Sequence, residues 1–282
     1  MSITICNFSN VYENQPFMEG LRLSGEATWI DCSDIPGTDC YCDDEAVETI
    51  RRRIADAGIK DADGIHFFDN GNYHYMSKIW TDMVQEPFSL VIFDHHPDMQ
   101  EPRFGNILSC GGWVKKTLEE NKFIDNVVII GVADHLVEEI WKEIASHPAD
   151  ARNDLQHKVT FIRESELPAV TLEGRSPDRV YQTSHSPHST LHIPHSTPVY
   201  LSIDKDALSP AYAATNWDQG SLDVVTLKEI ITGLATNHKI TGVDICGERA
   251  RDFAGDKFHT VQEADSLNDR INRELAEFLQ NL

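Results

Sequence analysis

A short segment that follows an apolar run concentrates acidic and imidazole side chains. In the stretch FDHHPDM, which begins at Phe93, the residues Asp94, His96 and Asp98 occupy alternate positions. Alternate side chains of an extended segment point the same way, so these three can converge on one point. The sequence therefore predicts two carboxylates and one imidazole together at the end of a strand.

A second pair of carboxylates follows another apolar run. The run VYLSI, which begins at Val199, ends in Asp204-Lys-Asp206, where the acids again alternate. Ligands of an open parallel sheet gather beyond the carboxyl ends of its strands, so the two acid-rich ends can face a single point. Four carboxylates there would repel one another unless cations lay among them, and oxygen mixed with imidazole suits Mn²⁺ or a similar divalent ion. The competing explanation, a surface turn with helix-capping aspartates, is disfavoured by the presence of two such motifs.

Eight short apolar runs must position these side chains. They predict buried strands, since most are rich in β-branched residues and too short for helices, and they begin at Ile3, Ala27, Gly64, Leu90, Val127, Val159, Val199 and Ile240. Helical patterns lie between many of them, over residues 43–57, 111–120, 136–146, 226–237 and 261–279. This alternation predicts the α/β class, a three-layer α/β/α fold with a mainly parallel sheet of about eight strands.

One segment has a composition unlike the rest. We expect a single domain over residues 1–282, but residues 171–198 within it are rich in Ser, Thr, Pro and His. The tract could bind metal through His185, His188, His192 and His195. Prolines forbid a helix that would align these histidines, and no carboxylate cluster accompanies them. We therefore prefer the interpretation of a long surface insertion.

The chain is strongly acidic, with 24 Lys and Arg against 46 Asp and Glu and a net charge of −22. A nucleic acid partner is not expected, because phosphate binding needs a basic face, whereas a cationic substrate would be attracted. A solvated acidic surface is the simpler explanation of this charge. The sequence lacks an apolar run of about 18 residues and a signal peptide pattern, so we expect no membrane partner and a cytoplasmic location.

Six cysteines are spread along the chain, at positions 6, 32, 40, 42, 110 and 246, without a C-x-x-C pair. A chain of this length does not need disulfides, so we interpret all six as free thiols. Cys40 and Cys42 alone would make an incomplete metal site. A partly buried loop before a helix is the simpler explanation of that pair.

The two acidic motifs resemble those of the ureohydrolase superfamily, which contains arginase, agmatinase and formiminoglutamase. FDHHPD is similar to the D-x-H-x-D motif of these enzymes, and LSIDKDALSP is similar to their S-x-D-x-D-x-x-x-P motif. The resemblance extends from about residue 64 to about residue 250. It implies an eight-stranded parallel sheet with helices on both faces and a site for two Mn²⁺ ions.

The resemblance also implies a ligand set. His74, in the stretch NGNYH, is the counterpart of the histidine in the family's G-G-D-H-S loop. One ion would then be held by His74, Asp94, Asp98 and Asp204. The other would be held by Asp94, His96, Asp204 and Asp206, so that two of the aspartates bridge the ions.

Substrate contacts are implied in the same way, with two departures from the family. Asp134, in the stretch IGVAD, matches the I-G-x-R-D stretch near the substrate's amino end, and QGSL from Gln219 matches a G-G-L turn. Cys110 stands where arginases have a proton-shuttling histidine. The D-I-V-E motif, whose Glu holds the guanidinium, reads Asp244-Ile-Cys-Gly-Glu248 here, so the acid comes one residue late. Either a bulge realigns Glu248 or the substrate differs; we expect Glu248 to bind the substrate.

The chemistry expected of such a site is hydrolysis. Two adjacent cations can lower the pKa of a bridging water toward neutrality, and the hydroxide would attack a trigonal carbon such as that of a guanidinium. Asp98 or Asp206 would pass a proton to the leaving amine. Cys110 would assist this transfer if the start of the following helix lowers its pKa, and the alternative is a small buried residue that fills space.

We therefore expect a hydrolase of a guanidino, or related amidine or formimino, C–N bond. Its substrate would be arginine, agmatine or peptide-bound arginine, and a homo-oligomer is implied because family members commonly form trimers or hexamers. One alternative is an amide deacylase of the same fold, similar to the histone deacetylases. Those enzymes use one zinc ion and lack counterparts of His74 and Asp206. The other alternative is a non-catalytic relative that binds metal.

Overall fold

The protein is described here from a computed structural model, which covers residues 1–102, 105–146, 155, 157–169, 181–182, 190–191, 193–194 and 197–282. Most of the predicted insertion at 171–198 lies outside the described residues. The four histidines of that tract, His185, His188, His192 and His195, lie outside them too.

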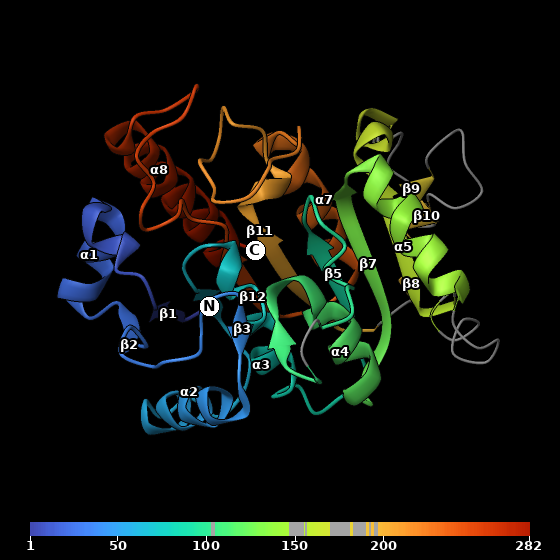
Figure 1. Cartoon of the computed structure of the whole chain (residues 1–282), viewed down its shortest axis with the longest axis horizontal. Coiled ribbons are helices and arrows are strands. Elements are labelled where there is room, and N and C mark those ends of the chain that lie inside the picture. Colours follow the sequence, from blue (N-terminus) through green and yellow to red (C-terminus); the bar gives the residue numbers. More distant parts are fainter. Residues whose placement is uncertain are drawn as a thin grey trace.

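An eight-stranded sheet in which all strand pairs are parallel forms the centre of the molecule (Figure 1). Its strand order is β2-β1-β4-β12-β11-β5-β7-β8. The strands are β1 (Ile3–Asn7), β2 (Ala27–Asp31), β4 (Ile65–Phe67), β5 (Phe88–Phe93), β7 (Ile124–Val132), β8 (Val159–Arg163), β11 (Val199–Asp204) and β12 (Ile240–Cys246). Each of the eight apolar runs forms one of these strands, so the predicted sheet is confirmed.

Helices cover both faces of the sheet (Figure 1). One face packs against α1 (Pro16–Ser24), α7 (Val224–Asn237) and α8 (Val261–Gln280). The other packs against α2 (Asp44–Asp56), α3 (Met76–Thr81), α4 (Trp113–Glu120) and α5 (Asp134–Ser146). The predicted three-layer α/β/α architecture is therefore confirmed.

The side chains of each strand alternate between these two layers. In β11, Leu201 and Ile203 belong to the core beneath α7 and α8, whereas Tyr200 belongs to the core on the opposite face. Both faces are dry, so the strands are apolar throughout, as expected for a parallel sheet. Local signals fix the flanking helices: the Asp43 side chain accepts a hydrogen bond from the Ala46 N–H at 2.8 Å and caps α2.

Short elements complete the fold around the carboxyl edge of the sheet. β3 (Tyr41–Cys42) and β6 (Leu108–Ser109) pair antiparallel, as do β9 (Tyr181–Gln182) and β10 (Thr190–Leu191). Short 3₁₀ helices occur at η1 (Val11–Asn14), η2 (Gly71–Tyr73), η3 (Cys110–Gly112), η4 (Glu164–Ala169) and η5 (Lys205–Ala207). Of these, η2, η3 and η5 adjoin the residues of the predicted site.

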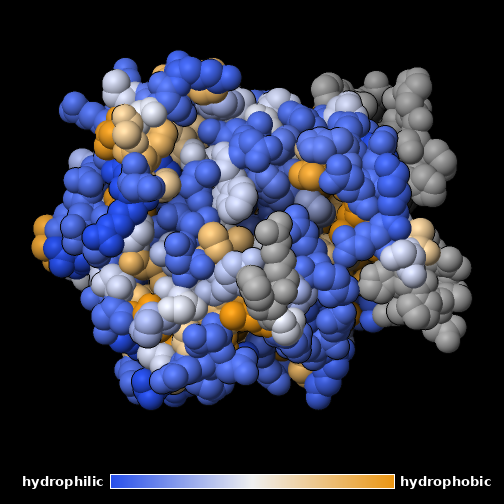
Figure 2. All heavy atoms as spheres, viewed as in Figure 1, coloured by the Kyte–Doolittle hydropathy of each residue, from blue (hydrophilic) through white to orange (hydrophobic). Residues whose placement is uncertain are grey.

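The face drawn in Figure 2 is predominantly hydrophilic, with apolar residues scattered over it. This agrees with the large excess of acidic over basic residues. Within the described part of the chain, no helix combines the length and the apolar character that crossing a membrane requires.

Candidate metal centre

Strand pairing brings the two acidic motifs together. β5 and β11 are neighbours in the sheet, and Phe93 pairs with Ile203 at their carboxyl ends. Asp94 and Asp204 are the next residues of these two strands, so they emerge side by side at the same edge. Both side chains are almost completely buried, at 1% and 2% exposure.

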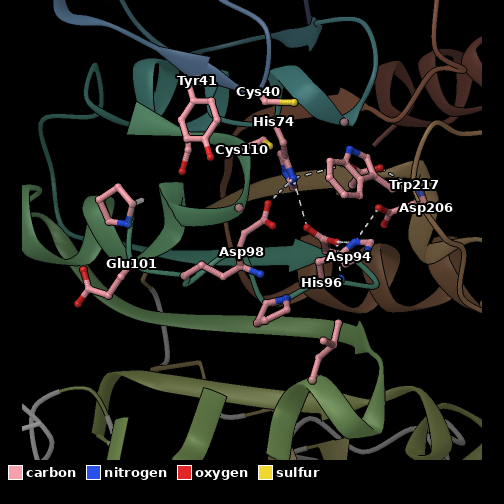
Figure 3. A pocket seen from close by; sticks show the side chains of 18 residues that line it. Cys40, Tyr41, His74, Asp94, His96, Asp98, Glu101, Cys110, Asp206 and Trp217 are labelled. Carbon is pink, nitrogen blue, oxygen red and sulfur yellow. Dashed lines mark hydrogen bonds and ion pairs between the residues drawn. The ribbon is translucent and has the colours of Figure 1, made fainter. Parts of the chain in front are cut away.

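One cluster forms around His74, which follows η2 (Figure 3). Its Nδ1 atom lies 2.9 Å from Oδ2 of Asp98, 3.2 Å from Oδ2 of Asp94 and 3.5 Å from Oδ2 of Asp204. Ligand atoms of His74, Asp94 and Asp98 all lie within 4.8 Å of one another. A single cation can therefore contact all three.

A second cluster forms around His96. Its Nδ1 atom lies 3.0 Å from Oδ2 of Asp206 and 3.5 Å from Oδ1 of Asp94. Ligand atoms of Asp94, His96 and Asp206 also lie within 4.8 Å of one another. Asp94 thus belongs to both clusters, as a ligand that bridges two ions would.

Hydrogen bonds from the surrounding chain hold these ligands in place. The other ring nitrogen of His74, Nε2, lies 2.9 Å from the Ser202 hydroxyl, and that of His96 lies 3.2 Å from Oδ1 of Asp218. The indole N–H of Trp113 donates to Oδ2 of Asp98 at 2.8 Å. Partners of this kind orient the ligands of metal sites, with Nδ1 of each histidine left to face the carboxylates.

The charges within the cluster support cation binding. Burial, followed by the nearby charge of Asp206, raises the pKa of Asp204 to about 7. Burial, followed by the charge of Asp94, raises the pKa of Asp206 to about 6. Oδ2 of Asp94 is buried and has no hydrogen-bond partner, although Nδ1 of His74 lies 3.2 Å away. Divalent ions would remove the repulsion and supply the missing partner, so the donor set fits two hard cations.

The histidines respond to the same carboxylates. Burial alone would lower the pKa of His74, but Asp94 and Asp98 outweigh it and raise that pKa well above its usual value. Burial is likewise outweighed at His96, whose pKa is raised by Asp206 and Asp94. Without metal, protons on these rings compensate the carboxylates, and bound cations would displace them.

A cavity of about 410 Å³ opens onto both clusters. It is lined by the six predicted ligands and, further out, by Cys40, Tyr41, Gln100, Glu101, Cys110 and Trp217, among others. Figure 3 shows five of these ligands, His74, Asp94, His96, Asp98 and Asp206, pointing into this space. The structure thus brings His74, Asp94, His96, Asp98, Asp204 and Asp206 to one wall of one cavity.

Comparison with known proteins shows the family of this chain. A model of the Arginase family matches residues 8–247. The chain belongs to the arginase family. The resemblance read from the motifs is therefore confirmed.

Several known proteins are similar to this chain over most of its length. An uncharacterized protein of Thermotoga maritima is 26% identical over 266 residues, which cover 94% of this chain and 86% of that protein. The solved structure of proclavaminate amidino hydrolase from Streptomyces clavuligerus has a TM-score of 0.63 at 16% identity, covering 98% of this chain and 91% of that one. Formimidoylglutamase from Bacillus subtilis has a TM-score of 0.57 at 11% identity, covering 99% and 88%. At these identities the two structures establish a shared fold.

Cys246 is a candidate ligand that the motifs did not reveal. Its thiol donates to Oδ2 of Asp204 at 3.2 Å, and its ligand atom clusters with those of Asp204 and His74. It ends β12, the neighbour of β11 in the sheet. That position at a strand end was the available signal, since the carboxyl edges of adjacent parallel strands face the same site.

The structure does not bring Glu248 to the cavity, which differs from the sequence expectation. Glu248 is completely buried and forms an ion pair with Lys205. It also accepts hydrogen bonds from Gln15 and Asn272, each at 2.7 Å. The carboxylate is thus held by three partners inside the protein.

Gly247 occupies the position that the acid has in the arginase-family motif D-I-V-E. Its φ of +88° belongs to the left-handed region. A Cβ atom there would collide with Oδ1 of Asp204 and would lie only 2.6 Å from the backbone nitrogen of Lys205. The motif's acid therefore cannot be accommodated at this position without rearrangement.

Asp134 lies at the start of α5 and outside the described residues that line the cavity. It accepts hydrogen bonds from the N–H and hydroxyl groups of Ser165, at 3.2 Å and 2.6 Å. Its neighbour Leu136 does line the cavity, so the segment is close to the mouth of the site. The segment that matches the I-G-x-R-D stretch therefore lies near the site. The Asp134 side chain itself contacts Ser165 and does not line the cavity.

Cys110 does line the cavity, but its acidity differs from expectation. A hydrogen bond with Cys40, followed by burial, raises the pKa of the Cys110 thiol above its usual value. This direction is opposite to the lowering expected from the start of the following helix, and the role of Cys110 in proton transfer stays a prediction.

Proposed function

We propose that the protein is a binuclear manganese hydrolase of a guanidino, or related amidine or formimino, C–N bond. The observation that carries this proposal is the pair of ligand clusters that share Asp94 at the wall of a cavity. Names of similar proteins support the substrate class, since they include an amidino hydrolase, an agmatine ureohydrolase and a formimidoylglutamase.

The ligand assignment takes the three residues of each cluster and adds Asp204 to both, as the arginase-family resemblance implies. His74, Asp94, Asp98 and Asp204 would hold one ion, and Asp94, His96, Asp204 and Asp206 the other. The donors are four carboxylates and two imidazoles, which favours manganese over metals that prefer thiolates. When bound, the ions would supply Lewis acidity and a water of lowered pKa.

The protein's own residues would orient the substrate and move protons. Asp98 is fixed by Trp113 and borders the cavity, so its carboxylate can accept a proton and deliver it to the leaving amine. A guanidino substrate would give urea and an amine, whereas a formimino substrate would give an amide. Cys110 lines the cavity and its pKa is raised by the hydrogen bond with Cys40, so we assign the thiol a supporting role as a hydrogen-bond donor.

Trp217 can recognise a cationic substrate. It lines the cavity, is 43% exposed, and its ring lies 5.9 Å from that of His96. A guanidinium over an indole gains about 0.5–2 kcal/mol. This contact would replace part of the binding energy that arginase-family enzymes obtain from the acid at the position of Gly247. Trp217→Leu should raise KM for a guanidinium substrate about tenfold and Trp217→Phe much less, and equal KM values for both variants would contradict this role.

A turnover assay tests the proposed activity. The manganese-loaded protein is incubated with arginine, agmatine, an arginine-containing peptide, a formimino amino acid and an acetyl-lysine peptide, and urea, ammonia and free amine are measured. We expect turnover of a guanidino or formimino compound that Asp94→Ala abolishes. Turnover of the acetyl-lysine peptide alone would instead identify a deacylase.

A non-catalytic metal-binding relative is the second candidate. Gly247 and Cys110 favour it, because each replaces a group that the arginase-family motifs provide for the reaction. Two bound manganese ions with no turnover of any compound above the Asp94→Ala background would select this candidate.

A further inference from the structure

Two thiols face each other at the mouth of the cavity. The pair β3–β6 matches Tyr41 with Ser109, so one position further along Cys40 lies opposite Cys110. The Cys110 N–H donates to the Cys40 carbonyl at 2.9 Å. Cys40 itself is not extended, since its φ is +60°, so it is the contact between the two thiols that brings this pair within reach of a disulfide.

The side chains of this pair are in contact and open to the cavity. The two thiols hydrogen-bond to each other, and both line the cavity. Figure 3 shows them side by side next to His74. Both residues are half-buried, so a small solute in the cavity can reach them.

Each thiol sits on a segment that positions a predicted metal ligand. After Cys110, the Val114 N–H donates to the carbonyl of Asp98 at 3.0 Å, beside the Trp113 contact to the same residue. Before Cys40, the carbonyl of Thr38 accepts a hydrogen bond from the Tyr75 hydroxyl at 2.6 Å, next to His74. A covalent link between the thiols would therefore join the segments that support His74 and Asp98.

We propose that Cys40 and Cys110 form a reversible disulfide that restrains the wall of the metal site. The oxidant is a small disulfide such as oxidised glutathione. A Cys40 thiolate attacks it, forming a mixed disulfide and releasing one glutathione thiol; Cys110 then displaces the second glutathione as its own proton leaves. The net step converts two protein thiols and one glutathione disulfide into one protein disulfide and two glutathione thiols.

The acidity of the two thiols agrees with these roles. The hydrogen bond with Cys110 lowers the pKa of the Cys40 thiol, which favours Cys40 as the attacking group. Cys6 and Cys32 also share a hydrogen bond, but Cys6 is completely buried and Cys32 nearly so. That inner pair is out of reach of glutathione and offers a matched control.

Thiol counting tests the link without any metal. The metal-free protein is treated with oxidised glutathione, unfolded, alkylated with N-ethylmaleimide and weighed. We expect two of the six cysteines to resist alkylation until reduction, and peptide mapping to join residues 40 and 110. Cys6→Ser should keep this link, whereas Cys40→Ser and Cys110→Ser should each abolish it. Six alkylated thiols in the oxidised protein, or a link elsewhere, would overturn the proposal.

Two further readouts test the restraint. A disulfide that closes the long loop between Cys40 and Cys110 should raise the Tm of the metal-free oxidised protein by about 4 °C or more. Release of manganese to EDTA should slow at least about threefold after oxidation in the wild type, and stay unchanged in Cys40→Ser. An unchanged Tm and an unchanged release rate would overturn the restraint. A protein that binds no manganese would count against the proposed function alone, because the thiol count and the Tm do not depend on metal.

Discussion

Nδ1 of His96 lies 3.0 Å from Oδ2 of Asp206, although the two residues are 110 positions apart in the sequence. The pairing of β5 with β11 produces this contact, because each residue follows the carboxyl end of one of these strands. The predicted metal centre therefore depends on the strand order of the sheet as much as on the motifs themselves.

Substitution of individual ligands should remove the ions unequally. Asp94 belongs to both clusters, whereas Asp206 belongs only to the one around His96. After manganese loading and gel filtration, elemental analysis should find no ion in Asp94→Ala and about one in Asp206→Ala. Asp125→Ala, an exposed site on β7, serves as the control and should keep two. Equal losses in the two ligand variants would contradict the shared role of Asp94.

The metal-free protein should lose stability as the pH rises. Burial and the charge of Asp206 raise the folded pKa of Asp204 to about 7, against an unfolded value of about 3.9. The folded state then binds the proton more tightly, so this contribution is complete below about pH 4 and is lost as the pH approaches about 7. Asp204→Asn keeps a neutral side chain at every pH.

The measurement for this effect is Tm in the presence of EDTA. Between about pH 5 and about pH 8, the wild type should lose stability relative to Asp204→Asn. Asp125→Asn, whose parent carboxylate is exposed, should follow the wild type throughout. A constant difference between wild type and Asp204→Asn would contradict the raised pKa.

Gly247→Ala should be strongly destabilising because it combines backbone strain with a collision. Gly58 has a similar φ of +82° but open space around it, so Gly58→Ala isolates the strain, at about 1 kcal/mol. At Gly247 the added methyl meets Asp204, and we expect a further loss of about 2 kcal/mol together with weaker manganese binding. Urea unfolding measures both variants, and equal costs would show that the site tolerates a side chain.

The buried pair of Lys205 and Glu248 should be structural. Lys205→Met leaves the Glu248 carboxylate buried without its cation, which should cost about 3–5 kcal/mol, and the double variant Lys205→Met/Glu248→Gln should recover part of this loss. The exposed pair of Lys239 and Glu86 is the control, since Lys239→Met should cost less than about 1 kcal/mol.

Metal content separates this role from a role in the cavity. Glu248→Gln should lower the free energy of unfolding and leave two manganese ions bound. If Glu248→Gln left the free energy of unfolding unchanged and raised the KM for the substrate, Glu248 would instead be a substrate-binding residue.

The sequence was sufficient for the sheet because its signals are local. Each strand is a short apolar run, most of them rich in β-branched residues, and helices such as α2 carry their own capping residues. Two of the helices that the structure describes in full were missed, for different reasons. α1 offered a signal, Pro16 at its first position and Gly25 just past its end, whereas the six residues of α3 are all buried and show no amphipathic period.

The site was predictable only where a motif repeated a known spacing. The alternation of Asp94, His96 and Asp98 is local, so it could be read directly. The position of Glu248 could not be predicted, because it depends on partners as distant in the sequence as Gln15, which lies 233 residues away. The thiol contact between Cys40 and Cys110 likewise arises from the pairing of β3 with β6, which no local sequence pattern predicted.

Anomalous diffraction from manganese-loaded crystals, recorded at the manganese edge, tests the two-metal centre most directly. The proposed ligand set predicts two peaks about 3.5–4 Å apart. One should lie among His74, Asp98 and Asp94, and the other among His96, Asp206 and Asp94. A map with no peak in this cavity, or with a single peak at full manganese loading, would contradict a binuclear site.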